Sequence, residues 1–176
     1  ISVIMSVYNG EKYLVQAIYS ILNQTYQNFE FIIIEDCSTD NSLDILEEYA
    51  KKDSRIKIIK KEKNIGIKGF IENLNLGISI AKGKYIARMD QDDVSLPERF
   101  QKQVDFLENN PEITLVGAQL NLVNEQNKIT GEAIAALQHR DIVKRITSQI
   151  QLFHPVIMFR KDQHIQYREK FLYCED

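Results

Sequence analysis

The feature that most constrains the fold is a repeated alternation of apolar, strand-like runs and amphipathic, helix-like segments in the first half of the chain. Strands are expected at residues 2–8, 29–34, 55–59 and 85–89, and helices at 11–23, 42–51 and 66–81. The run 29–34 is apolar throughout, which predicts a strand in a sheet covered on both faces. Strands that alternate with helices are typical of a parallel sheet. The sequence therefore predicts an α/β fold with a mainly parallel sheet flanked by helices.

The second half of the chain has a different rhythm. A helix is expected from Pro97, where a missing backbone donor is harmless, to about Asn109. Strands are expected at 113–123, 128–131 and 156–159, and a further helix at 140–147. These segments predict a small antiparallel region in addition to the main sheet, within a single domain over residues 1–176.

Composition excludes several classes of protein. The net charge of −3, from 22 basic and 25 acidic residues, argues against a dedicated nucleic-acid binder. No apolar run approaches the roughly 20 residues of a membrane span, and the opening residues do not match a signal peptide. The two cysteines, Cys37 and Cys174, form no metal or redox motif, which fits a reducing compartment.

Three polar clusters follow the first, second and fourth predicted strands, at residues 8–11, 35–40 and 90–93. In open α/β sheets, ligands bind beyond the carboxyl ends of the strands, so these clusters are expected to form one site. Asn9-Gly10 also suits a simple turn, and Ser38 and Asp40 also suit caps for the following helix; these alternatives stay open. Asp36 lies at the strand end itself, where its carboxylate can accept a hydrogen bond from a ligand amide.

The cluster Asp90-Gln91-Asp92-Asp93 places three carboxylates within four residues, directly after a run that is expected to be a buried strand. Such charges repel one another and need a compensating cation, unless the loop is simply solvated. Hard oxygen ligands suit Mg²⁺ or Mn²⁺, which often carry a phosphorylated ligand. The chain has no glycine-rich phosphate loop of the types GxGxxG or GxxxxGK[ST], so phosphate must be held by the metal and side chains.

The ordered motifs resemble those of glycosyltransferase family 2, whose members have the GT-A fold. The matching segments are SVIMSVYN at 2–9, SILNQTY at 20–26, EDCSTD at 35–40, NIG at 64–66, AKG at 81–83, DQD at 90–92, LPER at 96–99, HPVIMFRK at 154–161 and ED at 175–176. Glu35 and Cys37 depart from the usual Asp-Asp-Gly pattern of the second motif, but Asp36 keeps its carboxylate. Family members usually continue well beyond the Glu-Asp pair, so we expect a catalytic fragment without the acceptor-binding part.

The resemblance implies a nucleotide-binding half, residues 1–93, and an acceptor-side half, residues 94–176. Within the first half, Asp36 would bind the nucleotide base, which in this family is commonly uracil. Tyr8, Asn9 and Glu11 would line that pocket, although Tyr8 also suits the core. Asp90 would contact the ribose or reach the metal through water.

The resemblance also assigns the metal and the catalytic group. Asp92 would bind Mg²⁺ or Mn²⁺ between the two phosphates. Asp176 would be the base that deprotonates the acceptor, and Glu175 would orient the base or the acceptor. Without the resemblance, Glu175 and Asp176 would suit the acidic start of a helix. His154 would contact the diphosphate or the acceptor, or else be a packed structural histidine.

The implied reaction is an inverting, metal-dependent transfer of a hexosyl or N-acetylhexosaminyl group from a UDP-sugar. The acceptor would be a hydroxyl of a glycan or a lipid-linked molecule during polysaccharide synthesis. The implied location is the cytoplasm or the inner face of the membrane, with peripheral membrane association of the whole protein. The alternatives are a nucleotidyltransferase, which usually opens with a glycine-rich basic loop, and a non-catalytic sugar-nucleotide-binding domain.

Overall fold

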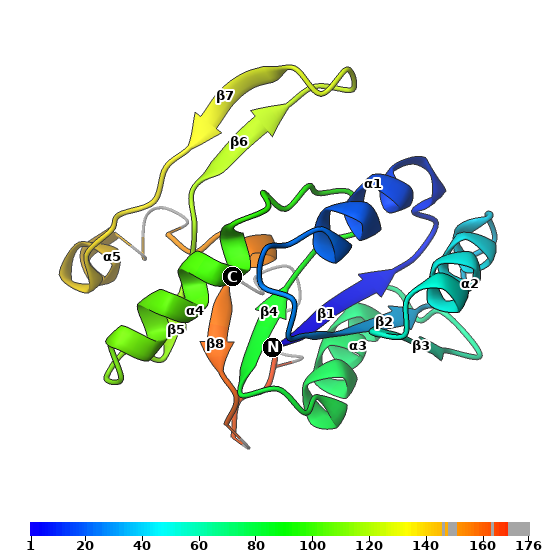
Figure 1. Ribbon diagram of the computed structural model, residues 1–176, viewed down its shortest axis with the longest axis horizontal. Coiled ribbons are helices and arrows are strands. Elements are labelled where there is room, and N and C mark those ends of the chain that lie inside the picture. The colour runs from blue at the N-terminus through cyan, green and yellow to red at the C-terminus, as the bar shows by residue number, and fades with distance from the viewer. Residues whose placement is uncertain (146, 148–150, 163, 169–176) are drawn as a thin grey trace.

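The computed structural model describes residues 1–145, 147, 151–162 and 164–168. Figure 1 shows a central sheet with helices on both sides and a separate hairpin that extends away from it. The elements in chain order are β1 (Ser2–Val7), α1 (Glu11–Leu22), β2 (Glu30–Glu35), α2 (Ser42–Lys52), β3 (Ile56–Lys60), α3 (Ile67–Ile80), β4 (Tyr85–Arg88), α4 (Arg99–Asn109), β5 (Leu115–Val116), β6 (Leu120–Val123), β7 (Ile129–Ala133), α5 (His139–Arg145), η1 (His154–Val156) and β8 (Met158–Arg160).

The main sheet has the strand order β3-β2-β1-β4-β8-β5. β1 pairs in parallel with β2 and β4, and β2 pairs in parallel with β3. β8 is antiparallel to both β4 and β5. The expected parallel α/β sheet is therefore present, with β1 at the centre of its parallel part.

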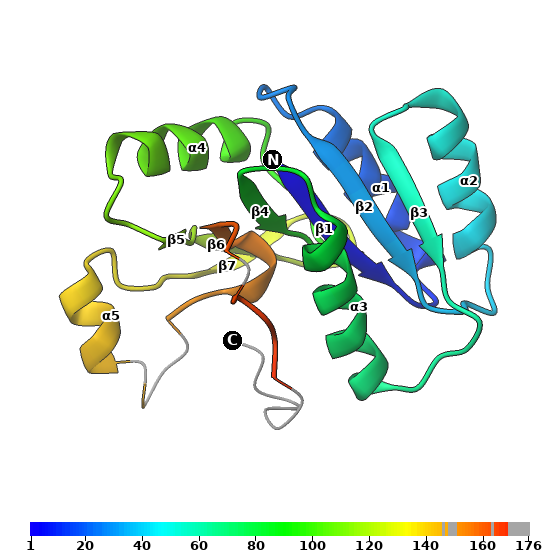
Figure 2. The same cartoon turned by 90° about the horizontal axis from the view of Figure 1, so that it is seen from below.

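Helices cover both faces of the sheet, as Figure 2 shows from below, and an apolar layer fills the space on each face. On one face, apolar side chains of α1, α2 and α4 pack on β1 and β2, among them Leu14, Leu46 and Phe100. On the other face, Leu74 and Ile78 of α3 pack on the isoleucines of the same strands. Burial on both faces explains why these strands carry continuous apolar runs.

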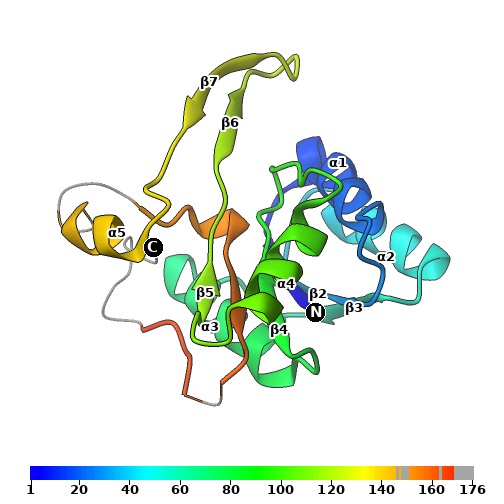
Figure 3. The ribbon, with the colours of Figure 1, turned by 60° about the vertical axis from the view of Figure 1, so that its left-hand side comes forward.

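The segment expected as one strand at 113–123 is divided between two sheets. β5 joins the edge of the main sheet, whereas β6 pairs with β7 in a two-stranded antiparallel sheet. Figure 3 shows this hairpin extending away from the main sheet. An exposed ion pair of 2.7 Å between Lys12 of α1 and Glu125 links the hairpin to the main body.

The strand expected at 156–159 begins later than predicted. Residues His154–Val156 form a short 3-10 turn, and the strand β8 runs from Met158 to Arg160. No helix among the described residues is long and apolar enough to cross a membrane.

Candidate active site

The polar clusters after β1, β2 and β4 lie side by side, because these three strands are neighbours in the sheet. The first two clusters are joined by hydrogen bonds. The backbone N–H of Asn9 donates to Ser38 Oγ at 3.1 Å, and the backbone N–H of Thr39 donates to Asn9 Oδ1 at 2.8 Å. The convergence expected from the strand ends is therefore present.

Asp40 serves the starts of two helices. Its Oδ1 accepts a hydrogen bond from the N–H of Ser42, the first residue of α2, at 2.9 Å, and its Oδ2 accepts one from the N–H of Glu11, the first residue of α1, at 3.0 Å. The Glu11 carboxylate in turn accepts from the backbone and the side chain of Asn41, at 2.9 and 2.7 Å. Of the alternatives left open, the helix-end role of Asp40 is present, and Glu11 is committed to Asn41.

Tyr8 follows β1 with its side chain 44% exposed, so it is not a core residue. Asn9 adopts a left-handed conformation with φ of 50°, which asparagine tolerates better than most residues. The backbone of Tyr8 is held by Gln91 of the acidic cluster, whose amide oxygen accepts from Tyr8 N–H at 2.8 Å. The first and third clusters are therefore also joined.

Asp36 is almost fully buried at the end of β2. Its Oδ2 accepts a hydrogen bond from Asn64 Nδ2 at 2.8 Å, whereas its Oδ1 has no partner within the described part of the chain. Burial raises the pKa of Asp36 above its usual value, and the nearby Asn73 side chain and the charge of Lys61 oppose this shift. Because an unsatisfied buried acceptor is costly, Asp36 has the capacity to accept a hydrogen bond from a ligand.

Helix α3 approaches Asp36 at Gly69, which the sequence analysis did not single out. A Cβ atom at Gly69 would lie 3.0 Å from Ile65 Cγ1, and 3.4 and 3.8 Å from the two carboxylate oxygens of Asp36. Glycine inside a helix costs about 1 kcal/mol relative to alanine. The glycine here keeps the space beside the Asp36 carboxylate open.

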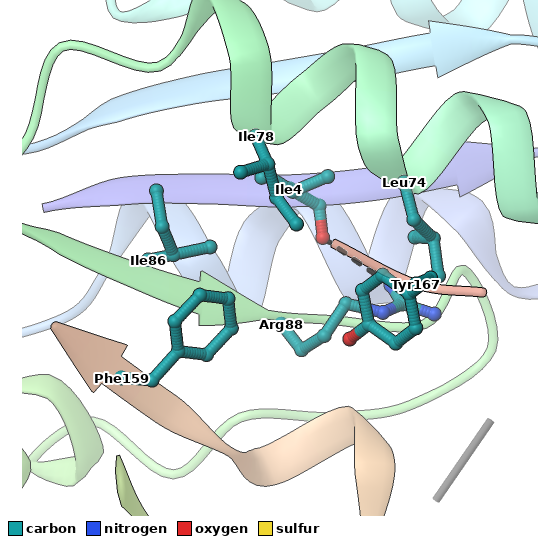
Figure 4. A pocket seen from close by; sticks show the side chains of 7 residues that line it. All are labelled: Ile4, Leu74, Ile78, Ile86, Arg88, Phe159 and Tyr167. Atoms are coloured by element: carbon teal, nitrogen blue, oxygen red, sulfur yellow. Dashed lines mark hydrogen bonds between the residues drawn. The ribbon is translucent and has the colours of Figure 1, made fainter. Parts of the chain in front are cut away.

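Asp90 is tied to a buried arginine. The Arg88 guanidinium forms an ion pair with Asp90, donates to the carbonyl of Met89, and donates to the carbonyl of Ile4 at 3.3 Å. The aromatic ring of Phe70 lies 5.4 Å from the guanidinium carbon. Figure 4 shows the stem of Arg88 beside aliphatic side chains of β1, β4 and α3. One side of the Asp90 carboxylate is therefore anchored within the fold.

Asp92 and Asp93 follow in the same loop with different surroundings. Asp92 is exposed, whereas Asp93 is partly buried. Burial raises the pKa of Asp93 to about 6, and the charges of Asp90 and Asp92 raise it further. Arg99, buried at the start of α4, opposes this shift. The shift therefore reflects burial first and the neighbouring carboxylates second.

The described residues contain no group of three or more His, Cys, Asp or Glu side chains arranged to hold a metal ion. The donors at the acidic cluster are carboxylate oxygens alone, which suits a hard cation. Mg²⁺ commonly takes one or two carboxylates and completes its shell with water and substrate phosphates. Asp92, which is exposed and adjacent to the Asp93 carboxylate, fits such an ion.

His154 is buried and contacts Arg88, the arginine that pairs with Asp90 of the acidic cluster. Arg88 Nε is 3.4 Å from His154 Nε2, and the Tyr167 hydroxyl is 2.6 Å from the same nitrogen. Burial lowers the pKa of His154 to about 4, with a further contribution from Arg88 and an opposing one from Asp90. The imidazole is therefore neutral at pH 7 and packed within the fold, and its contact with a diphosphate or an acceptor stays a prediction.

Two of the predicted residues, Glu175 and Asp176, lie outside the described residues. The structure adds Gln91, Gly10 and Gly69 to the residues that shape the site. A glycine inside a predicted helix was the signal for Gly69. Gln91 instead contacts Tyr8, which is 83 positions away, and Gly10 in the same loop. Nothing in the sequence near Gln91 or Gly10 predicts these contacts.

The sequence matches the family model described as Glycosyl transferase family 2 over residues 2–170. The chain belongs to this family. A relative from Methanocaldococcus jannaschii, named an uncharacterized glycosyltransferase, is 36% identical over 100% of this chain and 61% of its own length. The O-antigen biosynthesis glycosyltransferase WbnJ of Escherichia coli is 40% identical over 96% of this chain and 64% of its own. An uncharacterized glycosyltransferase of Haemophilus influenzae is 48% identical, over 72% of this chain and 38% of its own.

The chain thus spans less than two thirds of the length of these family 2 relatives. Among solved structures, Staphylococcus aureus TarS in complex with UDP superposes with a TM-score of 0.72 at 24% identity, over 99% of this chain and 52% of TarS. The mannosyltransferase PcManGT of Pyrobaculum calidifontis, in complex with GDP-Man and Mn²⁺, superposes with a TM-score of 0.64 at 15% identity, over 90% of this chain and 44% of its own. These likenesses confirm the predicted GT-A fold.

Proposed function

We propose that the protein transfers a sugar, with inversion, from a UDP-sugar to a hydroxyl of a glycan or a lipid-linked acceptor, with the help of a divalent metal. The observation that carries the proposal is the position of Asp36. Its buried oxygen Oδ1, which has no partner among the described residues, lies at the same end of the sheet as Asp90 and Asp92, on a strand two positions from β4. The same end of the sheet thus offers a hydrogen-bond acceptor for the nucleotide base and oxygen ligands for a metal ion bound to the diphosphate.

The base end of the donor would be bound by Asp36. A uracil ring presents an imide N–H, which can donate to a carboxylate oxygen. Asn64 and burial hold the Asp36 carboxylate in one orientation, so little freedom is lost when the base binds. Tyr8, which follows the neighbouring strand β1 and is exposed, provides an aromatic surface at the same end of the sheet.

The phosphate end would be bound through the acidic cluster. Asp92 is the proposed metal ligand, and Asp90, oriented by Arg88, would accept from a ribose hydroxyl or from a metal-bound water. A bound Mg²⁺ or Mn²⁺ would neutralise the charge that develops on the leaving diphosphate. Placing Asp90 by means of a buried arginine reduces the reorganisation needed when the donor binds.

The acceptor end depends on Asp176 as the proposed base and on Glu175 beside it. A sugar hydroxyl is a weak nucleophile, so a carboxylate that removes its proton during attack accelerates the transfer. Both residues keep the roles that the family resemblance implies. The transferred group, hexosyl or N-acetylhexosaminyl, the location at the inner face of the membrane and the membrane association stay predictions of the same resemblance.

Membership of family 2 favours glycosyl transfer over nucleotidyl transfer. A non-catalytic sugar-nucleotide-binding domain would share the nucleotide site but would not need a base at Asp176. Binding and transfer measured separately therefore distinguish the two remaining candidates.

The binding half of the proposal is tested by calorimetry with UDP, with and without Mn²⁺. We expect Mn²⁺ to raise the affinity for UDP. Asp92→Ala should abolish this metal-dependent gain, and Asp36→Ala should weaken UDP binding with the metal present. Asp105→Ala is the matched control, because Asp105 is exposed on α4 and contacts Gln101 instead of the site. Binding that is independent of metal, or unchanged in Asp92→Ala, contradicts the proposal.

The catalytic half is tested by sugar transfer or donor hydrolysis in the protein that carries Asp176→Asn. This variant should keep its affinity for UDP and Mn²⁺ and lose turnover, because asparagine cannot accept the proton. Retained transfer would remove Asp176 as the base, and a wild-type protein that binds UDP without any turnover would favour the non-catalytic candidate.

A further inference from the structure

Gln91, the residue between Asp90 and Asp92 of the acidic cluster, connects two loops that the sheet itself does not pair. The parallel ladder between β1 and β4 ends at the pair Ile4 and Arg88, after which Met89 N–H still donates to the carbonyl of Ile4 at 3.1 Å. Four residues after Ile4, just beyond the end of β1, the side chain of Gln91 pairs with the backbone of Tyr8. It accepts from Tyr8 N–H at 2.8 Å and donates from Nε2 to the carbonyl of Tyr8 at 3.1 Å.

The oxygen and the nitrogen of the Gln91 amide thus bind the N–H and the carbonyl of a single residue, Tyr8. The side chain thus acts as a surrogate strand residue, with one donor and one acceptor in fixed relative positions. Asparagine is one methylene shorter, and glutamate has no N–H to donate. Of the side chains similar in size, glutamine alone supplies both bonds at this reach.

Gly10 is shaped to receive the same side chain. A Cβ atom at Gly10 would lie 2.8 Å from Gln91 Oε1 and 2.9 Å from Gln91 Cδ, closer than atoms of this kind approach. The backbone at Gly10 has φ of −101° and ψ of 4°, which residues with side chains also adopt. The backbone conformation therefore does not demand glycine, but a side chain at this position would displace the Gln91 amide from Tyr8.

The opposite side of this loop is held by the cluster after β2. Gly10 N–H donates to the buried Ser42 Oγ at 2.8 Å, and Asn9 N–H donates to Ser38 Oγ. The segment from Tyr8 to Gly10 is thus fixed between the second cluster, which contains Asp36, and the acidic cluster. Gln91 is the contact on the acidic side.

We propose that Gln91 is a positioning residue that couples the nucleotide-binding loop, residues 8–11, to the aspartates on either side of it. Asp90 and Asp92 are its direct neighbours, so a Gln91 amide locked on Tyr8 sets the distance between the base pocket and the metal ligands. This inference rests on the proposed function of the site. Its consequence is that metal and nucleotide strengthen each other's binding through Gln91, since such coupling is reciprocal.

The measurement is calorimetry on the wild-type protein and on Gln91→Ala with three titrants: uridine, UDP, and UDP with Mn²⁺. Loss of two hydrogen bonds should reduce the Mn²⁺-dependent gain in UDP affinity by about 5- to 10-fold. Uridine, which lacks the phosphates, should change by less than about 2-fold. A residue with only a structural role would weaken all three titrants together or none of them.

One further variant changes the contact itself, and a second serves as a control. Gln91→Glu keeps the acceptor and loses the donor, and it should also lower the metal-dependent gain. Gln101→Ala is the matched control, because this glutamine also makes a side-chain hydrogen bond, to Asp105 at 2.8 Å on the exposed face of α4. The control should bind all three titrants like the wild type.

A double-mutant cycle with Gly10→Ala tests the geometry independently. Gly10→Ala alone must displace Gln91, so it should lower the metal-dependent gain as much as Gln91→Ala does. In the double variant the crowding atoms are gone, so it should be no worse than either single variant. Strictly additive losses would overturn the proposed contact, because residues that act independently add.

The outcomes separate this inference from the function on which it rests. A wild-type protein that does not bind UDP with Mn²⁺ overturns the proposed function, and the coupling with it. A wild-type protein that binds, with Gln91→Ala showing the same metal-dependent gain, overturns the role of Gln91 alone. A selective loss in Gln91→Ala, shared by Gly10→Ala and not additive, supports it.

Discussion

The guanidinium of Arg88 is buried to 1% exposure and forms an ion pair with Asp90, whose side chain is 32% exposed. The pair therefore runs from the interior of the sheet to the edge where the polar clusters meet. Its buried end is stabilised by backbone carbonyls of Ile4 and Met89 and by the ring of Phe70. A charge inside the fold thus orients a carboxylate at the site.

Arg88→Met should destabilise the protein by about 2–4 kcal/mol, because the backbone carbonyls and Asp90 lose their charged donor. The free energy of unfolding in urea measures this. Lys84→Met is the control, since Lys84 pairs with Glu108 on the surface and its loss should leave stability almost unchanged. If the two substitutions lower the free energy of unfolding equally, the buried ion pair contributes no more to stability than the exposed one.

Gly69→Ala should separate stability from binding. The methyl group favours the helix by up to about 1 kcal/mol, so thermal stability should be maintained or rise. The same methyl would fill the space beside the Asp36 carboxylate, and we expect UDP affinity to fall by roughly tenfold. Ser79→Ala, at an exposed position of the same helix, should leave UDP affinity unchanged. Unaltered UDP binding in Gly69→Ala would mean that the nucleotide does not use this space.

Glu30 should make the protein sensitive to acid. Burial alone would raise its pKa, but hydrogen bonds from Lys57, the Ser2 hydroxyl and the backbone N–H of Lys82 outweigh burial and lower the pKa to about 2. A carboxylate with a depressed pKa stabilises the fold above its unfolded pKa, here about 4.5, and loses this contribution as the pH falls toward 2. Urea unfolding between pH 7 and pH 2.5 measures the loss.

Glu30→Gln is the matching variant. It should be less stable than the wild type at pH 7 and should show a weaker dependence of stability on pH below about 4.5. Glu48→Gln is the control, because Glu48 pairs with Lys52 on the exposed surface of α2. A wild-type protein and a Glu30→Gln variant with parallel pH profiles would refute the linkage.

Cys37→Gly should stabilise the protein. Cys37 has a φ of 62°, in the left-handed region where side chains are disfavoured. Relief of this strain should exceed the entropy cost of glycine and raise the free energy of unfolding by about 0.5–1 kcal/mol. Cys37→Ala keeps a Cβ atom and should give no gain. If both variants stabilise equally, the thiol is responsible and the backbone is not.

Much of the fold follows from local pattern. The four parallel strands and the helices between them were predicted within a few residues, because a sheet covered on both faces requires continuous apolar runs and its helices require an apolar stripe. The division of residues 113–123 between two sheets was not predicted. β5 has two residues and β8 three, and such short strands are defined by their distant partners more than by their composition.

The sequence by itself determined the order of elements and the polar clusters that follow three apolar strands, in a series that resembles one family. Strand order then decided what the residues of those clusters do. It placed Asp36 and Asp92 at one edge, committed Glu11 to Asn41, buried His154 behind Arg88, and brought Gln91 onto Tyr8. The physical reason is that apolar periodicity depends only on residues close together in the sequence. Hydrogen bonds and burial depend on neighbours that only folding brings together.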